Sequence, residues 1–224
     1  MRITFPRRFR GPLTSANGGY ACGRLASLVG APEVEVTLRL PPPLDRPLDV
    51  RREGERILLL DAEELVAEAR PAAVELSAPE PVSYEAALEA ERRHVRVGDP
   101  VFRECYVCGT RAEGDGLAVH VGPVAGREPL HAATWVVREV SPAIVWAAID
   151  CPGAYAVGAE GRGEAVLGRM TARVEGLPRL GERCVVVAWP LGEDGRKLYA
   201  GTALFAESGE PLAVARQVWI LPRA

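Results

Sequence analysis

The stretch "TSANGGYACGRLAS", residues 14–27, reads as a helix that begins on two glycines. Glycine costs a helix about 1 kcal/mol per residue relative to alanine, so the pair at 18–19 needs a physical reason. The segment also has an echo, because "GGYACG" at 18–23 is matched by "GAYAVG" at 153–158 with four identities at a separation of 135. The similarity of the two segments suggests that the chain contains two related halves, each with such a helix.

Further matches follow in the same order along the chain. "TLR" at 37–39 corresponds to "TAR" at 171–173, and "AR" at 69–70 corresponds to "AR" at 215–216. The first separation, 134, is close to 135, and the second, 146, indicates that the second copy is longer by about one hairpin. Ordered matches at a nearly constant offset indicate an internal duplication. We expect one helix in each copy, around Tyr20–Val29 and Val145–Val157.

Each helix is followed by a run of strand candidates. "VEVTLRL" at 34–40 alternates apolar and polar residues, as a half-buried strand does. Hairpin turns are indicated by "GEDG" at 192–195 and "SG" at 208–209. The other expected strands are Ile57–Leu60, Leu65–Ala69, Leu117–Val121, Ala132–Val137, Leu167–Val174, Cys184–Trp189, Lys197–Phe205 and Leu212–Ile220.

One helix against a long antiparallel sheet, twice over, is an α+β arrangement. We place the N-terminal half at 1–80, a linker at 81–104 and the C-terminal half at 105–224. The linker should carry a short helix, Tyr84–Arg93, with Ser83 as its N-cap. Because neither half has enough sheet to cover its helix alone, we expect the two to share one continuous sheet as a pseudo-dimer within one chain.

Composition narrows the class of protein. The chain has 224 residues, an apolar fraction of 48% and a net charge of −3, which suits a packed core and argues against a nucleic-acid binder. No apolar run approaches the roughly 18 residues that cross a bilayer, and the N-terminus has no signal-peptide core. Five cysteines favour a reducing cytoplasm over a disulfide framework. The arginines of the first ten residues are expected on an edge strand rather than on nucleic acid or a membrane.

With these residues in view, the chain resembles the TesB-like acyl-CoA thioesterase superfamily, whose members have a double hotdog fold. "NGGY" at 17–20 is similar to the glycine pair of the first helix, "VWAAID" at 145–150 to the second helix, and "LAVARQ" at 212–217 to the last strand. A separate likeness is "CYVCG" at 105–109 followed by "GL" at 116–117, which resembles the entry segment of PaaI-like hotdog thioesterases.

The resemblance implies an oxyanion or substrate-binding role for Asn17, Gly18, Gly19 and Tyr20. A helix N-terminus presents free N–H groups and a partial positive charge, and glycine lets a ligand carbonyl approach them closely. Donors of this kind stabilise the oxyanion of thioester hydrolysis by about 3–4 kcal/mol each. The alternative is that the glycines serve only close packing of the helix, and both readings remain open.

The resemblance also implies that Asp150 holds or deprotonates the attacking water and that Gln217 orients it. The corresponding positions of the first copy hold Ser15 and Pro71, so we expect one composite site per chain. Asp150 could instead cap the turn at 152–153. The family's third partner is a hydroxyl on the strand after the second helix, for which Thr171 is the candidate, although its spacing fits poorly.

Other residues allow weaker hypotheses. Arg196 and Lys197 follow a hairpin turn and could meet the phosphates of coenzyme A, or could simply be solvated. The pair Cys105 and Cys108 has no second pair at zinc spacing and Cys151 stands alone, so we expect free cysteines and no metal site.

Two functions remain. The first is hydrolysis of a medium or long acyl-CoA thioester with no cofactor. The second is non-catalytic acyl-CoA binding on the same fold. Neither nucleic acid nor membrane is an expected partner. The chain is expected to bind the acyl-CoA substrate, and a homo-oligomer of double-hotdog chains is a possible assembly.

Overall fold

The computed structural model describes residues 1–95, 100–159, 162–163 and 165–223, and within them eleven strands form one sheet. All neighbouring strands pair antiparallel, in the order β1-β3-β4-β5-β2-β8-β11-β10-β9-β7-β6. The strands are β1 (Arg2–Ile3), β2 (Glu33–Leu38), β3 (Leu48–Glu53), β4 (Arg56–Asp61), β5 (Glu64–Pro71), β6 (Gly122–Pro123), β7 (His131–Val136), β8 (Val166–Val174), β9 (Arg183–Asp194), β10 (Lys197–Ala206) and β11 (Pro211–Ile220).

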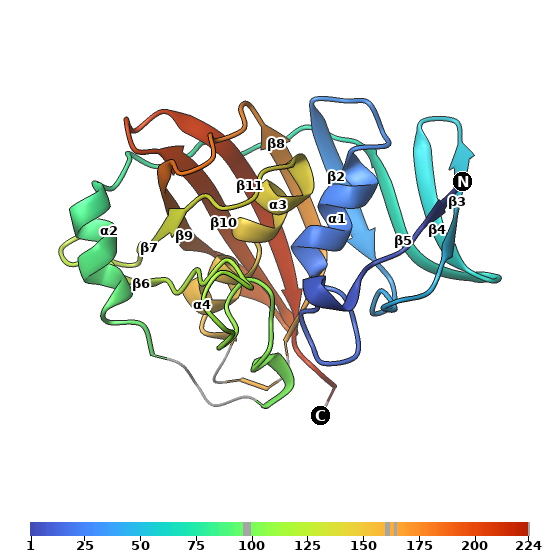
Figure 1. Ribbon diagram of the computed structural model, residues 1–224, viewed down its shortest axis with the longest axis horizontal. Helices are drawn as coiled ribbons and strands as arrows, with labels where there is room; N and C mark the ends of the chain where they lie inside the picture. Colours follow the sequence, from blue (N-terminus) through green and yellow to red (C-terminus); the bar gives the residue numbers. More distant parts are fainter. Residues whose placement is uncertain (96–99, 160–161, 164, 224) are drawn as a thin grey trace.

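The pairing of β2 with β8 joins the N-terminal and C-terminal parts of the sheet. Glu35 lies opposite Thr171 and Val36 opposite Met170, so strands from far apart in the sequence form one continuous surface. Figure 1 shows β3–β5 at one end and β6, β7 and β9 at the other. The expected shared antiparallel sheet is confirmed. The internal duplication and the boundaries at 80 and 104 stay predictions, and residues 96–99 of the linker lie outside the described residues.

The helices pack on both faces of this sheet. They are α1 (Gly18–Ala26), α2 (Tyr84–Glu91), α3 (Pro142–Ala148) and α4 (Cys151–Ala156), with single 3₁₀ turns at Arg7–Phe9 and Pro100–Phe102. In Figure 1, α1 and α3 lie side by side on the same face, in front of β2, β8 and β11. Their buried side chains and the inward residues of the strands form the main core.

The second predicted helix is wrong in one respect. We expected one helix over Val145–Val157, but α3 ends at Ala148 and α4 starts at Cys151. The break has a local cause, because Pro152 suits the first turn of a helix but cannot continue a preceding one. Asp150 therefore stands at a junction between two short helices instead of inside a helix.

The linker helix is confirmed, and the Ser83 hydroxyl accepts a hydrogen bond from the Ala86 N–H at 3.2 Å. It packs on the opposite face of the sheet from α1. Along β9, Cys184 and Val186 belong to the main core while Val185 and Val187 belong to a second cluster that contains Ala87 and Ala90. Successive residues of a strand point to opposite faces, so α2 covers the outer face at the β7–β9 end.

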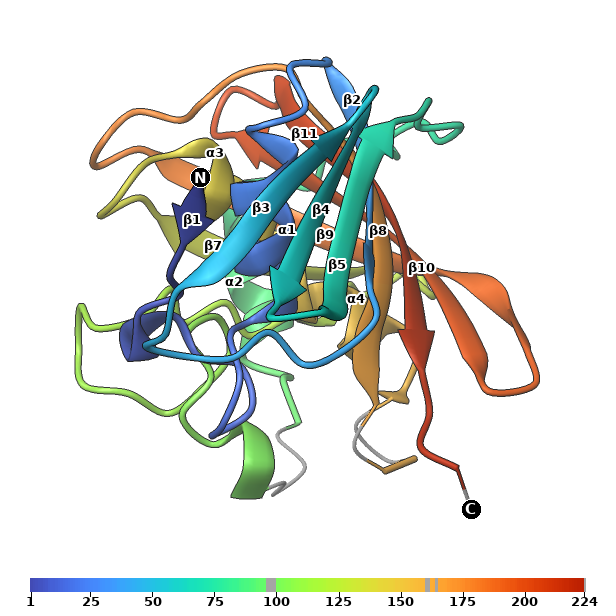
Figure 2. The same cartoon turned by 90° about the vertical axis from the view of Figure 1, so that its right-hand side faces the viewer.

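Two strand predictions need correction. The segment Leu117–Val121 is not a strand; its Leu117 and Val119 N–H groups bond to Tyr106 and Val107 instead of to the sheet. Only Gly122–Pro123 pairs there, as β6. The strand β3 was not expected, because the prolines before Leu48 and the charges after Val50 obscure its alternation. Figure 2 shows that β3, β4 and β5 form a curved end of the sheet.

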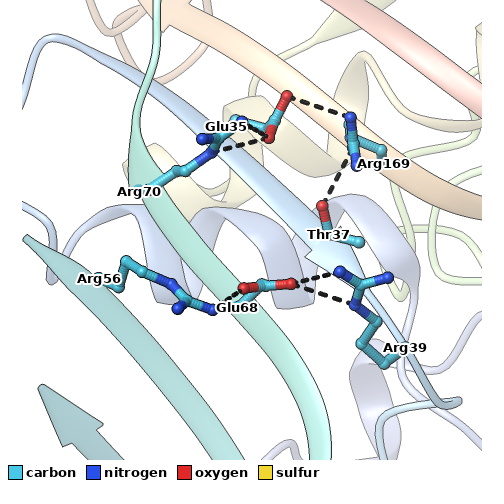
Figure 3. A network of polar contacts seen from close by, with 7 residues as sticks. All are labelled: Glu35, Thr37, Arg39, Arg56, Glu68, Arg70 and Arg169. Carbon is cyan, nitrogen blue, oxygen red and sulfur yellow. Dashed lines mark hydrogen bonds and ion pairs between the residues drawn. The ribbon is translucent and has the colours of Figure 1, made fainter. Parts of the chain in front are cut away.

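The outer face of the sheet at the β4–β5–β2–β8 end carries an ordered ladder of charges (Figure 3). Glu35 lies between Arg70 and Arg169. Glu68 lies between Arg39 and Arg56. Cross-strand pairs of opposite charge stabilise a sheet, so this polar face serves the fold on the side away from α1. None of the described helices has the length and apolar character needed to cross a membrane.

Candidate functional site

The carboxylate of Asp150 connects the two helices of the inner face. Its Oδ2 accepts hydrogen bonds from the Gly19 N–H at 2.8 Å and from Asn17 Nδ2 at 2.9 Å. Asp150 occupies the N-cap position of α4, yet its side chain makes no cap hydrogen bond there. The alternative that Asp150 caps the turn at 152–153 is therefore wrong for the side chain, which points to α1.

Asn17 prepares this contact as the N-cap of α1. Its Oδ1 accepts a hydrogen bond from the Tyr20 N–H at 2.8 Å, which leaves Nδ2 free to donate to Asp150. Asparagine is among the preferred N-cap residues because its side chain satisfies an N–H that has no partner within the helix. One side chain thus fixes both the start of α1 and the orientation of the carboxylate.

The glycines of α1 allow two helices to approach closely. A Cβ at position 19 would lie 2.4 Å from Asp150 Cβ and 2.5 Å from the Trp146 carbonyl oxygen. A Cβ at Gly23 would lie 2.6 Å from Ala143 Cα. The packing explanation therefore holds at these two positions, and the Gly19 N–H is engaged by Asp150. Gly18 is partly exposed and its added Cβ would meet only side-chain atoms of Leu167 and Leu38, at 3.0 and 3.4 Å.

Burial sets the charge of Asp150. The residue is 2% exposed, and desolvation raises the pKa of its carboxyl to about 7, against the opposing hydrogen bonds from Gly19 and Asn17. While Oδ2 has two donors, Oδ1 has no hydrogen-bond partner among the described residues. A buried carboxylate oxygen without a donor is rare in folded proteins and marks this position as a candidate for chemistry.

The structure brings Gln217 to the same helix junction. Its Nε2 donates to the Ile149 carbonyl at 2.6 Å and to Thr202 Oγ1 at 3.3 Å, and lies 3.2 Å from the Asp150 carbonyl. Its Oε1 accepts from Trp219 Nε1 at 2.8 Å. The amide therefore holds the backbone between α3 and α4 from the floor of the sheet, and both of its ends have protein partners.

Thr171 is not brought to this cluster. It pairs with Arg216 of β11, whereas Gln217 pairs with Met170. Residues directly opposite in an antiparallel pair share a face, and neighbours along a strand point to opposite faces. Thr171 consequently faces the outer, charged side of the sheet with Glu35, and its assignment as the third catalytic group is wrong for this structure.

The remaining predicted residues are placed as follows. The Tyr20 ring stacks on Phe9 with centroids 4.0 Å apart, so it serves an aromatic cluster beside the N-terminus of α1. Arg196 lies at the β9–β10 hairpin, where its Nη1 donates to the Leu221 carbonyl at 2.8 Å, and Lys197 lies opposite Asp194. These contacts are with the hairpin and the C-terminal segment, and not with the Asp150 junction.

A group that the sequence analysis missed lies beside Asp150. The sulfur atoms of Cys105, Cys108 and Cys151 lie within 4.8 Å of one another, and the Cys105 and Cys151 sulfurs are 3.6 Å apart. Asn17 Nδ2 lies 3.7 Å from the Cys151 sulfur and 3.9 Å from that of Cys105. In the sequence, Cys151 directly follows Asp150, which could have pointed to this group. The spacing rules for metal sites consider only ligands that are close together in the sequence, so they did not identify it.

The three thiols differ in acidity. Hydrogen bonds from Cys108 and Cys151, and then from the N–H groups of Cys108 and Val107, hold the pKa of Cys105 well below its usual range against desolvation. The pKa values of Cys108 and Cys151 are raised well above the usual range, chiefly by their hydrogen bonds to Cys105. Cys105 is therefore the most acidic of the three thiols. None of the five cysteines forms a disulfide, and all five are buried.

A cavity of about 420 Å³ opens at the C-terminal end of α1 and the N-terminal end of α3. Its lining is mainly apolar and includes Ala26, Val34, Trp146, Ala172, Val174 and Leu177. This volume is within the range of small-molecule sites. Asp150 does not line the cavity, but Trp146 of α3 does, four residues before Asp150.

No family model matches the chain, and no curated protein matches it. Solved structures do. A hot dog fold protein of unknown function from Alicyclobacillus acidocaldarius has a TM-score of 0.67 at 12% identity, covering 100% of this chain and 93% of that one. The tesB protein of Mycobacterium avium subspecies paratuberculosis has a TM-score of 0.61 at 15% identity over 99% and 93%. Acyl-CoA thioesterase II TesB2 of Mycobacterium marinum has a TM-score of 0.57 at 11% identity over 100% and 93%. These likenesses extend over the whole chain, which has the hotdog fold.

Proposed function

We propose that this protein hydrolyses a medium or long acyl-CoA thioester, with Asp150 as the general base. The observation that carries the proposal is the buried carboxylate whose Oδ2 is fixed by two donors of the α1 N-terminus while Oδ1 has no described partner. A general base needs this combination of a fixed position and a free lone pair. Two mycobacterial proteins of similar fold, a tesB protein and an acyl-CoA thioesterase II, support the reaction class.

In the proposed reaction, a water molecule bound at Asp150 Oδ1 gives its proton to the carboxylate as its oxygen adds to the thioester carbonyl. The tetrahedral intermediate then collapses with cleavage of the C–S bond, and Asp150 returns the proton to the leaving thiolate. The Gly18 N–H is our choice as donor to the oxyanion, because the Gly19 N–H is already bonded to Asp150. Gln217 acts as a positioning residue, through its bond to the Ile149 carbonyl.

The acyl chain is proposed to lie in the cavity at the far end of α1. A helix rises about 1.5 Å per residue, so Ala26 lies about 12 Å from Gly18 along α1. An acyl chain must be of medium or long length to bridge from the carboxylate to that cavity. Arg196 and Lys197 remain our proposal for the coenzyme A phosphates, because both are exposed cations at a hairpin tip.

A second function is favoured by a different observation. The Gly19 N–H and both ends of the Gln217 amide are engaged by protein groups, and Asp150 is almost fully buried. A protein that binds acyl-CoA without hydrolysing it needs no free donors at this junction. We keep non-catalytic acyl-CoA binding as the alternative.

The experiment is a hydrolysis assay of the purified protein over a series of acyl-CoA chain lengths, with detection of the released thiol. Asp150→Asn should lower kcat by roughly 10²- to 10⁴-fold, the usual contribution of a positioned base, while acyl-CoA affinity is kept. Asp49→Asn, an exposed substitution on β3, is the matched control and should leave turnover unchanged. If Asp150→Asn turns over like the parent, Asp150 is not the base. If the parent binds acyl-CoA without turnover, the alternative holds.

A further inference from the structure

The three buried cysteines beside Asp150 come from two distant parts of the chain. Cys105 and Cys108 lie in the loop before residue 117, and Cys151 begins α4. Their sulfurs converge within 4.8 Å, although the sequence separation from Cys105 to Cys151 is 46. Cysteine is often buried as a small apolar residue, so burial alone indicates nothing. Convergence of three sulfur atoms at one point needs a further explanation.

The loop that carries two of them has the form of a ligand-holding turn. The Gly109 N–H donates to the Cys105 carbonyl at 2.9 Å, which closes the turn around the two sulfurs. A Cβ at position 109 would lie 2.4 Å from both the N and the O of Cys105, so only glycine fits. A turn of fixed shape holds the Cys105 and Cys108 side chains in one orientation, as a metal site requires.

The sulfur spacing matches that of a tetrahedral zinc site. A Zn–S bond of about 2.3 Å places two sulfurs of a tetrahedral site about 3.8 Å apart. The Cys105 and Cys151 sulfurs are 3.6 Å apart and the third lies within 4.8 Å. Among the described residues, no fourth histidine, cysteine or carboxylate joins the group at this distance. Three protein ligands leave one position for a water or another small ligand.

The surroundings hold this cluster in place. Arg111 Nη1 donates to the Glu104 carbonyl at 2.8 Å, and Arg10 pairs with the Glu104 carboxylate at 2.5 Å, so two cations anchor the residue before Cys105. The Tyr106 N–H bonds to the Arg10 carbonyl at 2.7 Å. The loop is thereby preorganised to present two thiolates, the kind of ligand that soft metal ions prefer.

We propose that Cys105, Cys108 and Cys151 bind one Zn²⁺ ion, which ties the 105–109 loop to the junction between α3 and α4. The expectation of no metal site came from the missing second cysteine pair in the sequence. In the fold, Cys151 supplies a third ligand from a distance that spacing rules do not cover. The zinc site lies beside Asp150, but none of its three ligands takes part in the proposed hydrolysis, so zinc content and turnover test the two proposals independently.

The test is the zinc content of the full chain, expressed with added zinc and purified with a thiol reductant and no chelator. The parent should carry about one zinc per chain through gel filtration, measured by elemental mass spectrometry. Cys108→Ala and Cys151→Ala should each lose nearly all of it. Cys184→Ala, which removes a fully buried cysteine outside the cluster, is the matched control and should keep it.

A second measurement on the parent guards against variants that do not fold. After exchange of zinc for Co²⁺, the parent should show the near-ultraviolet charge-transfer absorption of thiolate–cobalt bonds. A parent that carries only a trace of zinc after incubation with it, and shows no such band with Co²⁺, overturns the proposal. So does a Cys105–Cys151 disulfide, found by peptide mass spectrometry, in protein that has been offered zinc under reducing conditions.

Discussion

The Gly19 N–H donates a hydrogen bond to the Asp150 carboxylate at 2.8 Å, across 131 residues of sequence. This contact joins the N-terminus of α1 to the junction of α3 and α4. The partial positive charge of a helix N-terminus favours a carboxylate at that place, which offsets part of the cost of burying it. The glycine pair of α1 therefore serves the carboxylate as well as the packing of the two helices.

Gly19→Ala should destabilise the protein by about 1–2 kcal/mol. The new Cβ would lie 2.4 Å from Asp150 Cβ and 2.5 Å from the Trp146 carbonyl, and overpacking of this kind costs about 1–3 kcal/mol. Alanine returns at most about 1 kcal/mol of helix propensity. Gly18→Ala is the control and should cost less, because its Cβ would lie 3.0 Å from Leu167 Cβ and meet no backbone atom, a smaller overlap than at position 19. Urea denaturation measures both, and equal losses would contradict the packing argument.

Gln217→Met should cost roughly 2–4 kcal/mol, since it leaves several buried groups unpaired at once. The Ile149 carbonyl would lose its donor, and Trp219 Nε1 would lose its acceptor. Trp219→Phe removes only the hydrogen bond between Trp219 Nε1 and Gln217 Oε1. It should therefore cost less than Gln217→Met, provided that neighbouring side chains fill the space left by the smaller ring. Denaturation midpoints of the two single variants and the double variant give the coupling. A Gln217→Met protein as stable as the parent would mean that the amide is not a positioning group.

Part of this arrangement could be read from the sequence. The strand candidates Leu167–Val174 and Leu212–Ile220 matched β8 and β11 to within two residues, although runs of consecutive residues in both strands are buried. The turn residues at 192–195 placed the β9–β10 hairpin, where Gly192 and Gly195 have positive φ angles. Apolar runs bounded by turn residues therefore located these elements without long-range information.

Contacts between distant residues could not be predicted in the same way. The approach of Cys151 to Cys105 and the engagement of the Gly19 N–H by Asp150 both depend on how α1, α3 and the 105–109 loop pack. Periodicity carries no information on such distances. The outward direction of Thr171 follows from its register against Arg216, which the similarity of "TLR" and "TAR" did not specify.

Glu68→Gln should lower stability by about 1 kcal/mol at neutral pH, with the difference vanishing in acid. Hydrogen bonds from Arg39, and then Arg56, outweigh desolvation and lower the pKa of this carboxyl in the folded state (Figure 3). A lowered folded-state pKa contributes stability above the unfolded value of about 4, and the contribution is lost as pH falls through the folded pKa. The size is modest because both arginines are about half exposed.

The measurement is the free energy of unfolding of parent and variant at a series of pH values from about 3 to 7. Glu63→Gln, an exposed substitution in the β4–β5 turn, is the control and should show no such trend. A constant difference between Glu68→Gln and parent across the series would show that the side chain acts through packing and not through its charge.

Val174→Phe should shift the proposed hydrolase toward shorter acyl chains. Val174 lines the cavity of about 420 Å³ at the far ends of α1 and α3, and a phenyl ring there fills space that the end of an acyl chain would occupy. Changes in apolar pocket volume alter discrimination by about 1–3 kcal/mol, so kcat/KM for the longest accepted acyl-CoA should fall roughly tenfold or more, with short substrates little affected. Val166→Phe is the control on the same strand, because Val166 is 44% exposed and does not line the cavity. An unchanged chain-length profile in a folded Val174→Phe protein would mean that the acyl chain lies elsewhere, since a chain that ends in this cavity cannot share it with the ring.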